Sequence, residues 1–311
     1  MELALATLAD KKLYKYRAID PHHPEYVSRI LTHNELYFPS PREFNDPWES
    51  KPQFVAGPVH DPQYRQRLVT VITSMMRNDP GIDREAVRRR AEQHTQEEVE
   101  ALVTAFIPEY WEALERYRVC SFCSSSRIAL LWSHYANAHE GFCLEFDAST
   151  DIFGGAFRVA YQDEYPSLDI ADDDDWALLK ASILTKSSDW SYEEEYRLVS
   201  AEPGNDELLS VSNKKFVFPP NLLTAVIFGT QMEAKDRKQL IKWADQGETS
   251  PTYREATLSA TKYELEIRPI EGDVEEEIRE EEEQGEKEAI TGRQIFWAVV
   301  AFLILVYFLS S

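Results

Sequence analysis

Four short clusters of this sequence combine charged and aromatic residues at spacings that could support chemistry. The first lies in residues 190–197, where a strand would place Glu193, Glu195 and Arg197 on one face. A nearby positive charge favours the ionised form of a carboxyl group, so Arg197 is expected to keep Glu195 charged. Two carboxylates beside a guanidinium need water or a polar ligand around them. An exposed sheet face with solvated charges accounts for the same pattern.

The second cluster belongs to a strand predicted at residues 12–19. Alternation along that strand would place Lys15 and Arg17 on one face. The rings of Tyr14 and Tyr16 would then face the other way. Such a strand could present a cation and two hydroxyl-tipped rings at the rim of a cleft, or it could be an edge strand with solvated charges.

The third cluster, Phe-Asn-Asp-Pro-Trp-Glu at residues 44–49, directly follows a predicted strand. Asn45 and Asp46 stand before a proline and favour a turn that is held by hydrogen bonds from side chain to backbone. The same side chains could approach a substrate, and the two roles are compatible.

The fourth cluster lies on a helix predicted over residues 127–139. Trp132 and Tyr135 belong to its apolar stripe and are expected to face the core, whereas His134 lies off that stripe. A histidine in this position is more often a surface residue than a catalytic one. Gly141 is expected to take the left-handed conformation just past the end of the helix.

A metal site is not predicted, although one spacing resembles that of small zinc fingers. The two cysteines and two histidines concerned are Cys120, Cys123, His134 and His139. The cysteines would fall on opposite sides of a strand and both histidines on a helix, which favours a coincidental match. The chain has three cysteines, an odd number that gives no disulfide framework and suits a reducing compartment.

The elements that would position these clusters alternate irregularly between strands and helices. Strands are predicted at residues 12–19, 35–39, 119–124, 142–147, 157–161, 193–201, 216–218, 225–228 and 263–267. Helices are predicted at residues 25–31, within 61–116, and at 127–139, 176–186 and 234–246. The alternation at residues 142–147 is typical of a half-buried strand. We therefore predict an α+β fold with a mixed, largely antiparallel sheet flanked by helices. Neither a Gly-rich phosphate loop nor a nucleophile elbow is present in the sequence.

The C-terminal part of the sequence predicts a membrane anchor. Every residue of the segment 295–309 is apolar, and a helix from residue 294 to 311 would reach about 27 Å, close to the thickness of a bilayer core. We expect a soluble domain over residues 1–270, a spacer over 271–291 and a single transmembrane helix over 292–311. The N-terminus has no pattern of a signal peptide, so the large domain is expected on the cytoplasmic side.

The spacer and the whole chain are strongly acidic. Residues 271–288 hold eleven acidic and two basic residues, and the net charge of the chain is −22. A segment of this composition has no apolar face to bury and is expected to be a solvated stalk. General nucleic-acid binding is not expected of such a protein, because it relies on Lys and Arg to neutralise phosphates.

The four clusters occur in an order that resembles the bacterial family catalogued as domain of unknown function 2971. The segments that carry the resemblance are LYKYR, ELYFPSPREFNDPWE, LLWSHYANAHEGFCLEFD, KSSDWSYEEEYRLV and AVIFGTQM, and together they span residues 12–268. The acidic spacer and the apolar tail lie outside it.

A more distant similarity is to ADP-ribosyltransferase-type domains. In those domains a basic or histidine residue on an early strand, an aromatic residue or serine, and a late Glu-x-Glu motif follow one another. Here Arg17 or Lys15, Tyr135 and the pair Glu193 and Glu195 occur in that order. The resemblance implies that Tyr135 stacks on nicotinamide while Glu195 stabilises the oxocarbenium-like centre as the glycosidic bond of NAD breaks.

These patterns lead to one preferred functional hypothesis and two alternatives. The preferred one is a membrane-tethered, NAD-consuming enzyme that acts in stress or phage defence. The candidate catalytic residues are Glu195, Glu193, Tyr135 and Arg17. The candidate residues for binding a nucleotide or small-molecule substrate are Tyr14, Lys15, Tyr16, Asn45, Asp46, Trp132, His134 and Arg197. The first alternative is a non-enzymatic sensor or interaction module. The second is a metal-dependent nuclease with carboxylates at Asp46, Glu49, Glu193 and Glu195, which the acidic composition disfavours.

Overall fold

The computed structural model describes residues 11–75, 83–172, 174–202, 208–270 and 276. The predicted spacer at 271–291, apart from Glu276, and the predicted transmembrane helix at 292–311 lie outside these residues. In the described part of the chain, no helix combines the length and the apolar character that crossing a membrane requires.

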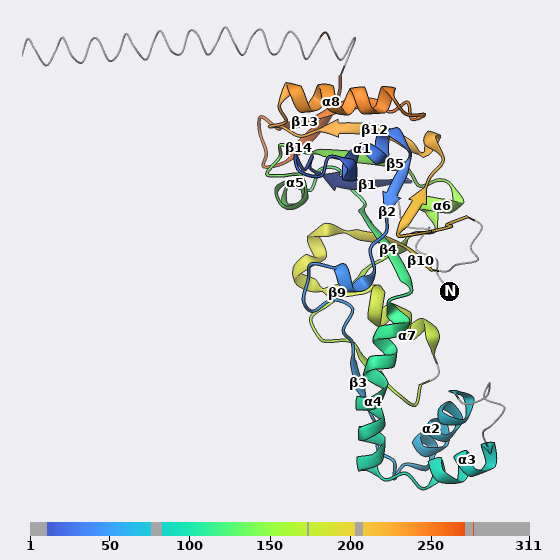
Figure 1. The fold of residues 1–311 in the computed structure, drawn as a ribbon. Helices are drawn as coiled ribbons and strands as arrows, with labels where there is room; N and C mark the ends of the chain where they lie inside the picture. The colour runs from blue at the N-terminus through green and yellow to red at the C-terminus, as the bar shows by residue number, and fades with distance from the viewer. Residues whose placement is uncertain (1–10, 76–82, 173, 203–207, 271–275, 277–311) are drawn as a thin grey trace, which may run out of the picture. The chain divides into compact units, whose positions relative to one another are not determined.

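Eight of the described strands form one sheet, in the order β14-β13-β12-β5-β1-β4-β10-β6 (Figure 1). They are β1 Lys12–Arg17, β4 Tyr117–Cys123, β5 Phe142–Asp147, β6 Phe157–Arg158, β10 Glu195–Ala201, β12 Leu223–Phe228, β13 Thr252–Leu258 and β14 Leu265–Pro269. β4 pairs antiparallel with β1 and β10, as does β10 with β6 and β13 with β14, whereas β12 and β13 are parallel. The predicted α+β class with a mixed, largely antiparallel sheet is confirmed.

Three small sheets of two strands each complete the described β-structure. The pairs are β2 Glu35–Tyr37 with β11 Lys215–Val217, β3 Gln53–Val55 with β8 Ser167–Asp169, and β7 Ala160–Gln162 with β9 Thr185–Ser187. The strands β3, β8 and β13 were not predicted, and β9 lies where the end of the helix at residues 176–186 was predicted. β13 was missed because its sequence, TYREATL, shows no alternation of apolar residues. In the structure most of its residues are half-buried or exposed.

The helices cover most of the predicted helical segments. Their bounds are α1 Glu25–Thr32, α2 Pro62–Met75, α3 Arg84–Glu92, α4 Gln96–Leu114, α5 Ala129–Tyr135, α6 Asp151–Gly154, α7 Asp175–Ile183 and α8 Ala234–Asp245, with short 3-10 helices η2 Pro41–Glu43, η3 Ser188–Glu193 and η4 Pro220–Leu222. Local capping sets two of the boundaries. The carboxylate of Asp83 accepts backbone N–H groups at the start of α3, and Thr95 forms a capping box with Glu98 at the start of α4.

The chain divides into two compact units, each built from discontinuous segments. The first unit comprises the described residues of Met1–Lys15, Glu35–Ser125 and Phe146–Phe218. The second unit comprises those of Tyr16–Asn34, Ser126–Glu145 and Pro219–Ser311. The boundaries pass through β1 and β5, so both strands contribute residues to each unit.

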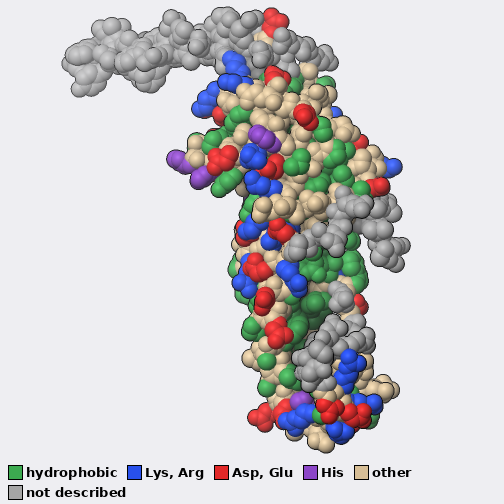
Figure 2. Space-filling view, turned by 45° about the vertical axis from the view of Figure 1, so that its right-hand side comes forward, with side chains coloured by type: hydrophobic (Ala, Val, Ile, Leu, Met, Phe, Trp, Pro, Cys, Tyr) green, Lys and Arg blue, Asp and Glu red, His purple; other side chains and the backbone are tan. Residues whose placement is uncertain are grey.

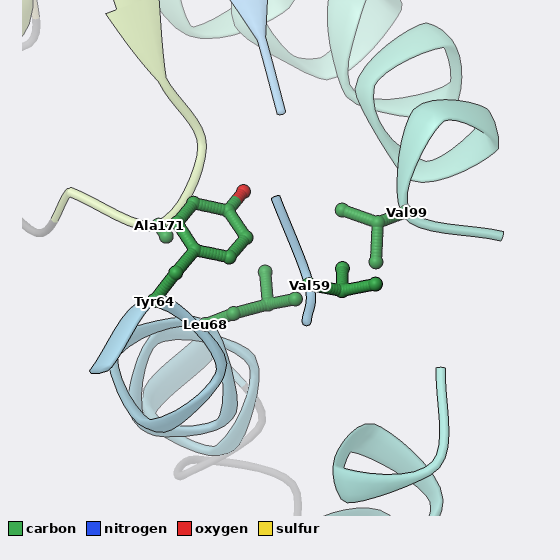
Figure 3. Packing of buried hydrophobic residues seen from close by; sticks show 5 residues of the cluster. All are labelled: Val59, Tyr64, Leu68, Val99 and Ala171. Atoms are coloured by element: carbon green, nitrogen blue, oxygen red, sulfur yellow. The ribbon is translucent and has the colours of Figure 1, made fainter. Parts of the chain in front are cut away.

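The first unit has several apolar centres. One joins α2, α4 and two loops, and Figure 3 shows its five side chains converging from these segments: Val59, Tyr64, Leu68, Val99 and Ala171. A second packs the end of α4 against β4 and the end of α7, through residues that include Tyr110, Leu114, Val119 and Ile183. α4 is therefore fixed at both ends by buried contacts.

The second unit is built around β12, β13 and two helices. Leu240, Ile241 and Ala244 bury one face of α8. Gly247 follows α8, and a side chain there would collide with the backbone of Leu31 and Thr32 at the end of α1. The close approach of the two helices thus requires a glycine at this position.

The predicted helix at residues 127–139 is too long, and the prediction for Gly141 is wrong. α5 ends at Tyr135, and Asn137, Ala138 and His139 take positive φ angles of 45°, 50° and 73°. Gly141 does not have a positive φ. A glycine is needed there for space instead, because a Cβ would lie 2.9 Å from the Cα of Ala136.

The half-buried character predicted for residues 142–147 is also wrong. All residues of β5 except the last are buried, including Glu145 at 2 % exposure. The Nη1 of Arg254 donates to one carboxylate oxygen of Glu145 at 2.8 Å, and the Thr224 hydroxyl donates to the other at 2.8 Å. This neutralisation lets a charged residue occupy a buried strand.

Candidate active site

Five charged side chains meet in the interior of the first unit and form what we call the charge cluster. Its members come from the segment before β3, from β9, from η3 and from β10: Glu49, Lys186, Glu193, Glu195 and Arg197. None of them is more than 7 % exposed. The exposed sheet face considered as an alternative for residues 190–197 is therefore not what the chain forms.

The guanidinium of Arg197 is the centre of the cluster. Its Nε donates to Oε1 of Glu195 at 2.8 Å and its Nη2 to Oε2 at 2.9 Å, which is a two-pronged ion pair. Nη2 also donates to Glu49, and Nη1 donates to the carbonyl of Ile183. The ring of Phe44 lies 4.9 Å from Cζ and covers the cation. All three nitrogens of the Arg197 guanidinium thus donate hydrogen bonds within the protein. The predicted position of Arg197 beside Glu195 is confirmed.

Lys186 links the remaining carboxylates. Its Nζ donates to Glu193 at 2.6 Å and to Glu195 at 3.4 Å, and it lies 4.0 Å from Oε2 of Glu49. The ring of Trp190 lies 4.9 Å from the ammonium. One lysine therefore neutralises charge from three separate segments.

Glu193 reaches the cluster by a different path from the one predicted. It belongs to η3 rather than to the strand, and Glu194 after it takes a left-handed φ of 46°. β10 begins only at Glu195. The two carboxylates consequently do not share a strand face, and they meet because both reach Lys186.

The environment separates the pKa values of two carboxyl groups in the cluster. Burial raises the pKa of Glu49 above its ordinary value of 4.5, and the nearby charges of Arg197 and Lys186 only reduce this effect. Burial also acts on Glu195, but Arg197 and Lys186 outweigh it and hold the pKa of Glu195 at about 2. Of these two carboxyl groups, Glu49 therefore takes up a proton more easily.

A pocket of about 270 Å³ opens beside the charge cluster, between residues 46–52, 162–166 and 181–189. Of the five cluster members, Glu49 and Lys186 are among the described residues that line it. Asp46 also lines the pocket and is 7 % exposed. Its Oδ1 accepts the N–H of Trp48 at 2.9 Å, and its Oδ2 is buried without a hydrogen-bond partner among the described residues.

The other predicted site residues of the first unit have different surroundings. Lys15 is buried, donates to the carbonyl of Ser121 at 2.7 Å and lies 5.0 Å from the ring of Phe122. Tyr14 pairs with Cys123 in the register of β1 and β4. Asn45 is exposed, and its neighbour Asp46 holds the turn as predicted.

Five predicted site residues belong to the second unit: Tyr16, Arg17, Trp132, His134 and Tyr135. Trp132 is fully buried, its indole N–H donates to the carbonyl of Ser126 at 2.8 Å, and its ring meets that of Tyr16 edge-on at 5.1 Å. The core position predicted for Trp132 is confirmed, whereas Tyr135, for which it was also predicted, is only half-buried. The residues that the sequence joined into one candidate site are thus distributed over both units.

Two residues of the site were not among the predicted catalytic or substrate-binding residues. Glu49 entered only the nuclease alternative, and Lys186 was read as the end of a helix. The signal for Glu49 was its place two residues after the Asp-Pro turn. For Lys186, no local pattern distinguishes a lysine that pairs in the core from one in water.

The described residues show no arrangement of metal ligands. Within them, no group of three or more His, Cys, Asp or Glu side chains is placed to hold a metal ion. Cys120, Cys123 and Cys143 are buried and form no disulfide bond. Burial raises the pKa of the Cys123 thiol, so it resists ionisation.

Comparison with known proteins gives one match. A family model described as "Protein of unknown function (DUF2971)" matches residues 131–198. Among curated proteins no match is found, and none is found among solved structures. The match extends from α5 to β10 and includes Lys186, Glu193, Glu195 and Arg197 of the charge cluster. It supports the resemblance of this part of the chain to that family.

Proposed function

We propose that the first unit is an enzyme that breaks a glycosidic bond of a nucleotide cofactor such as NAD, at the pocket lined by Asp46, Glu49 and Lys186. The observation that carries the proposal is the position of Glu49. It is a carboxyl group with a raised pKa on a pocket wall, and Glu195, with a pKa of about 2, stays ionised behind it. Enzymes divide acid–base roles between such pairs.

The reaction would place positive charge next to carboxylates. Cleavage of a glycosidic bond develops oxocarbenium character on the sugar, and a preorganised negative charge stabilises it. Asp46 lines the pocket and would supply this charge, since its Oδ2 has no hydrogen-bond partner among the described residues. The C–N bond breaks with its electron pair moving to the ring nitrogen, so nicotinamide leaves as a neutral base.

Glu49 would act on the acceptor. As a water or another hydroxyl group attacks the sugar carbon, Glu49 takes its proton, and a raised pKa suits a general base. Glu195 has a different role from the one implied by the resemblance. Arg197 and Lys186 occupy both of its oxygens, so it positions these cations and, through them, Glu49.

The membrane tether belongs to the same proposal. We infer that residues 292–311 anchor the protein in a bilayer and that residues 271–291 form a spacer, with both units on the cytoplasmic side. What supports this is the uninterrupted apolar run at 295–309 after a segment rich in Glu. A role in stress or phage defence would follow if the consumed cofactor is NAD.

The test is release of nicotinamide from NAD by the purified protein, followed by chromatography. Wild-type protein should consume NAD, and Glu49→Gln should lower the rate by about 10²-fold or more, the usual worth of a general base. Asp46→Asn should lower it as well. Glu194→Gln is the matched control, since Glu194 is exposed and lies outside the described pocket lining. The proposal fails if NAD survives prolonged incubation or if Glu49→Gln keeps the full rate.

A non-enzymatic binding module is the second candidate. The full pairing of Arg197 and Glu195 favours it, because a rigid, closed cluster is what a scaffold requires. In that case a ligand would occupy the pocket and be recovered unchanged, which the same chromatography would show.

A further inference from the structure

We infer that the mouth of this pocket binds an organic cation with a planar ring and that the indole ring of Trp48 is the surface on which this ring stacks. The inference rests on the pocket of the proposed function and names the charge and shape of the group that it accepts. It does not require catalysis, so it applies to a binding module as well.

The exposure of Trp48 is the first observation. Its side chain is 68 % exposed, although Asp46 and Glu49 beside it are each only 7 % exposed. The ring of Trp48 thus presents a large apolar surface to water between two buried carboxyl residues. Trp48 is also one of the residues that line the pocket.

The ring of Trp48 is exposed but its backbone is fixed. The N–H of Trp48 donates to Oδ1 of Asp46 at 2.9 Å, and its carbonyl accepts the hydroxyl of Tyr165 at 3.0 Å. The two rings meet edge-on, with centroids 6.4 Å apart and an interplanar angle of 83°. Tyr165 also lines the pocket. A ring that is held in place before binding loses little freedom when a ligand stacks on it.

The charge of the pocket selects the sign of the ligand. Its described lining holds five carboxyl groups, from Asp46, Glu49, Asp163, Glu164 and Asp189, and two amino groups, from Lys51 and Lys186. Glu49 and Lys186 are already paired within the charge cluster, which leaves four carboxyl groups against Lys51, whose Nζ donates to the carbonyl of Pro47 at 2.6 Å. An anionic group would meet repulsion here, whereas a cation would be attracted.

Asp46 provides the independent sign of a ligand. Asp46 lines the pocket and is only 7 % exposed, one of its oxygens is used by the turn, and Oδ2 is buried without a hydrogen-bond partner among the described residues. A buried carboxylate oxygen without a partner is costly, and the positive charge of a ligand bound beside Asp46 would offset part of that cost. The aromatic face next to it adds a cation–π contact.

The experiment compares two probes that share one ring and differ in charge. 1-Methylnicotinamide is a cation and nicotinamide is neutral, and their binding to the full-length protein in detergent is measured by calorimetry. The cation should bind at least about tenfold more tightly than the neutral probe, and higher salt should weaken only the binding of the cation. Equal affinities of the two probes would overturn the inference without the need for any variant.

Two variants locate the binding surface. Trp48→Leu should weaken binding of the cation about tenfold, whereas Trp176→Leu should leave it unchanged. Trp176 is the matched control because its ring is 47 % exposed in the same unit and it is absent from the described lining of this pocket. Asp46→Asn should weaken the binding of the cation more than the binding of the neutral probe. An unchanged affinity in Trp48→Leu would contradict the inference.

Failure of the inference and failure of the enzyme proposal give different results. If the cation binds tightly and its binding depends on Trp48, but NAD is not consumed, the inference stands and the enzyme proposal is refuted. Consumption of NAD that depends on Glu49, together with equal affinities for the two probes and a rate that Trp48→Leu does not alter, would refute the inference and keep the enzyme proposal.

Discussion

Arg197 holds together carboxylates from distant parts of the sequence in the interior of the first unit. It pairs with Glu195 two positions before it on β10 and with Glu49, which lies 148 positions earlier in the sequence. The first pair follows from the alternation of a strand. The second depends on a contact that no local pattern contains.

Removal of Arg197 should be one of the most destabilising substitutions in the chain. In Arg197→Met, Glu195 loses both charge-assisted hydrogen bonds, and the buried carboxylates keep only Lys186. We expect the free energy of unfolding to fall by about 3–5 kcal/mol, measured by urea denaturation. Arg118→Met is the matched control, because the Arg118 pair with Glu202 is nearer to solvent, with side chains 13 % and 20 % exposed. A loss of about 1 kcal/mol is expected there, and equal losses in both variants would show that the cluster is unimportant for stability.

The charge cluster should also shape the dependence of stability on pH. The folded pKa of Glu49 is raised, so the folded state takes up a proton first and the free energy of unfolding should rise as the pH falls toward 4.5. The folded pKa of Glu195 is lowered to about 2, so its contribution, roughly 3 kcal/mol, is present above pH 4.5 and is lost between pH 4.5 and 2.

Difference measurements isolate these two groups from other carboxylates. Glu43, for example, also has a pKa of about 2. Burial raises this pKa, but the hydrogen bond from Lys214 helps to hold it down, so the stabilisation that Glu43 provides is lost in the same acid range. The free energy of unfolding, measured with denaturant, should no longer rise toward pH 4.5 in Glu49→Gln. In Glu195→Gln it should fall less below pH 4.5 than in the wild type. Parallel curves for the wild type and both variants would show that neither pKa differs between the folded and unfolded chain.

At the scale of elements, the periodicity of apolar residues in the sequence predicted most of the described helices. It failed where the packing of neighbouring segments sets the conformation. The region after α5 is such a case, since three successive residues, Asn137, Ala138 and His139, take left-handed conformations and the chain then passes close to the backbone of Arg17. Space, rather than backbone conformation, makes glycine necessary at residue 141.

Gly141→Ala should therefore destabilise the second unit although its backbone angles suit any residue. The added Cβ would collide with the carbonyl of Arg17 and lie 2.9 Å from the Cα and the carbonyl oxygen of Ala136. We expect a loss of about 3 kcal/mol, as in overpacked cores, visible as a lower melting temperature. Gly155→Ala serves as the control, because the nearest atom to its added Cβ, the carbonyl oxygen of Asp151, is 3.1 Å away. A mild effect at Gly141 would mean that the turn can shift to make room.

At the scale of the whole molecule, the charge of the chain is large but not segregated on the face that can be seen. Figure 2 shows basic and acidic side chains interspersed along this face. A net charge of −22 is a poor match for general nucleic-acid binding, which relies on Lys and Arg to neutralise phosphates. This favours the small-molecule hypotheses over a nuclease.

Deletion of the chain after Gly272 tests the predicted division into domain, spacer and anchor. The truncated protein should remain in the supernatant after high-speed centrifugation of lysed cells and should unfold cooperatively. The full chain should sediment with membranes and be released by detergent but not by high salt, because the apolar segment and not charge would hold it there. Aggregation of the truncated protein would show that residues after 272 belong to the core.

The sequence by itself determined the order of most strands and helices, the α+β class, the turn at Asp46 and the pairing of Glu195 with Arg197. Each of these follows from interactions between residues close in the chain: strand alternation, helix periodicity and the geometry of an Asp-Pro turn. Only the tertiary structure decided that Glu49 and Lys186 join this pair, that the five charges are buried, and that Glu193 reaches them from a 3-10 helix. The physical reason is that burial and ion pairing depend on which distant segments pack together, and a charged residue looks the same in the sequence whether water or another side chain neutralises it.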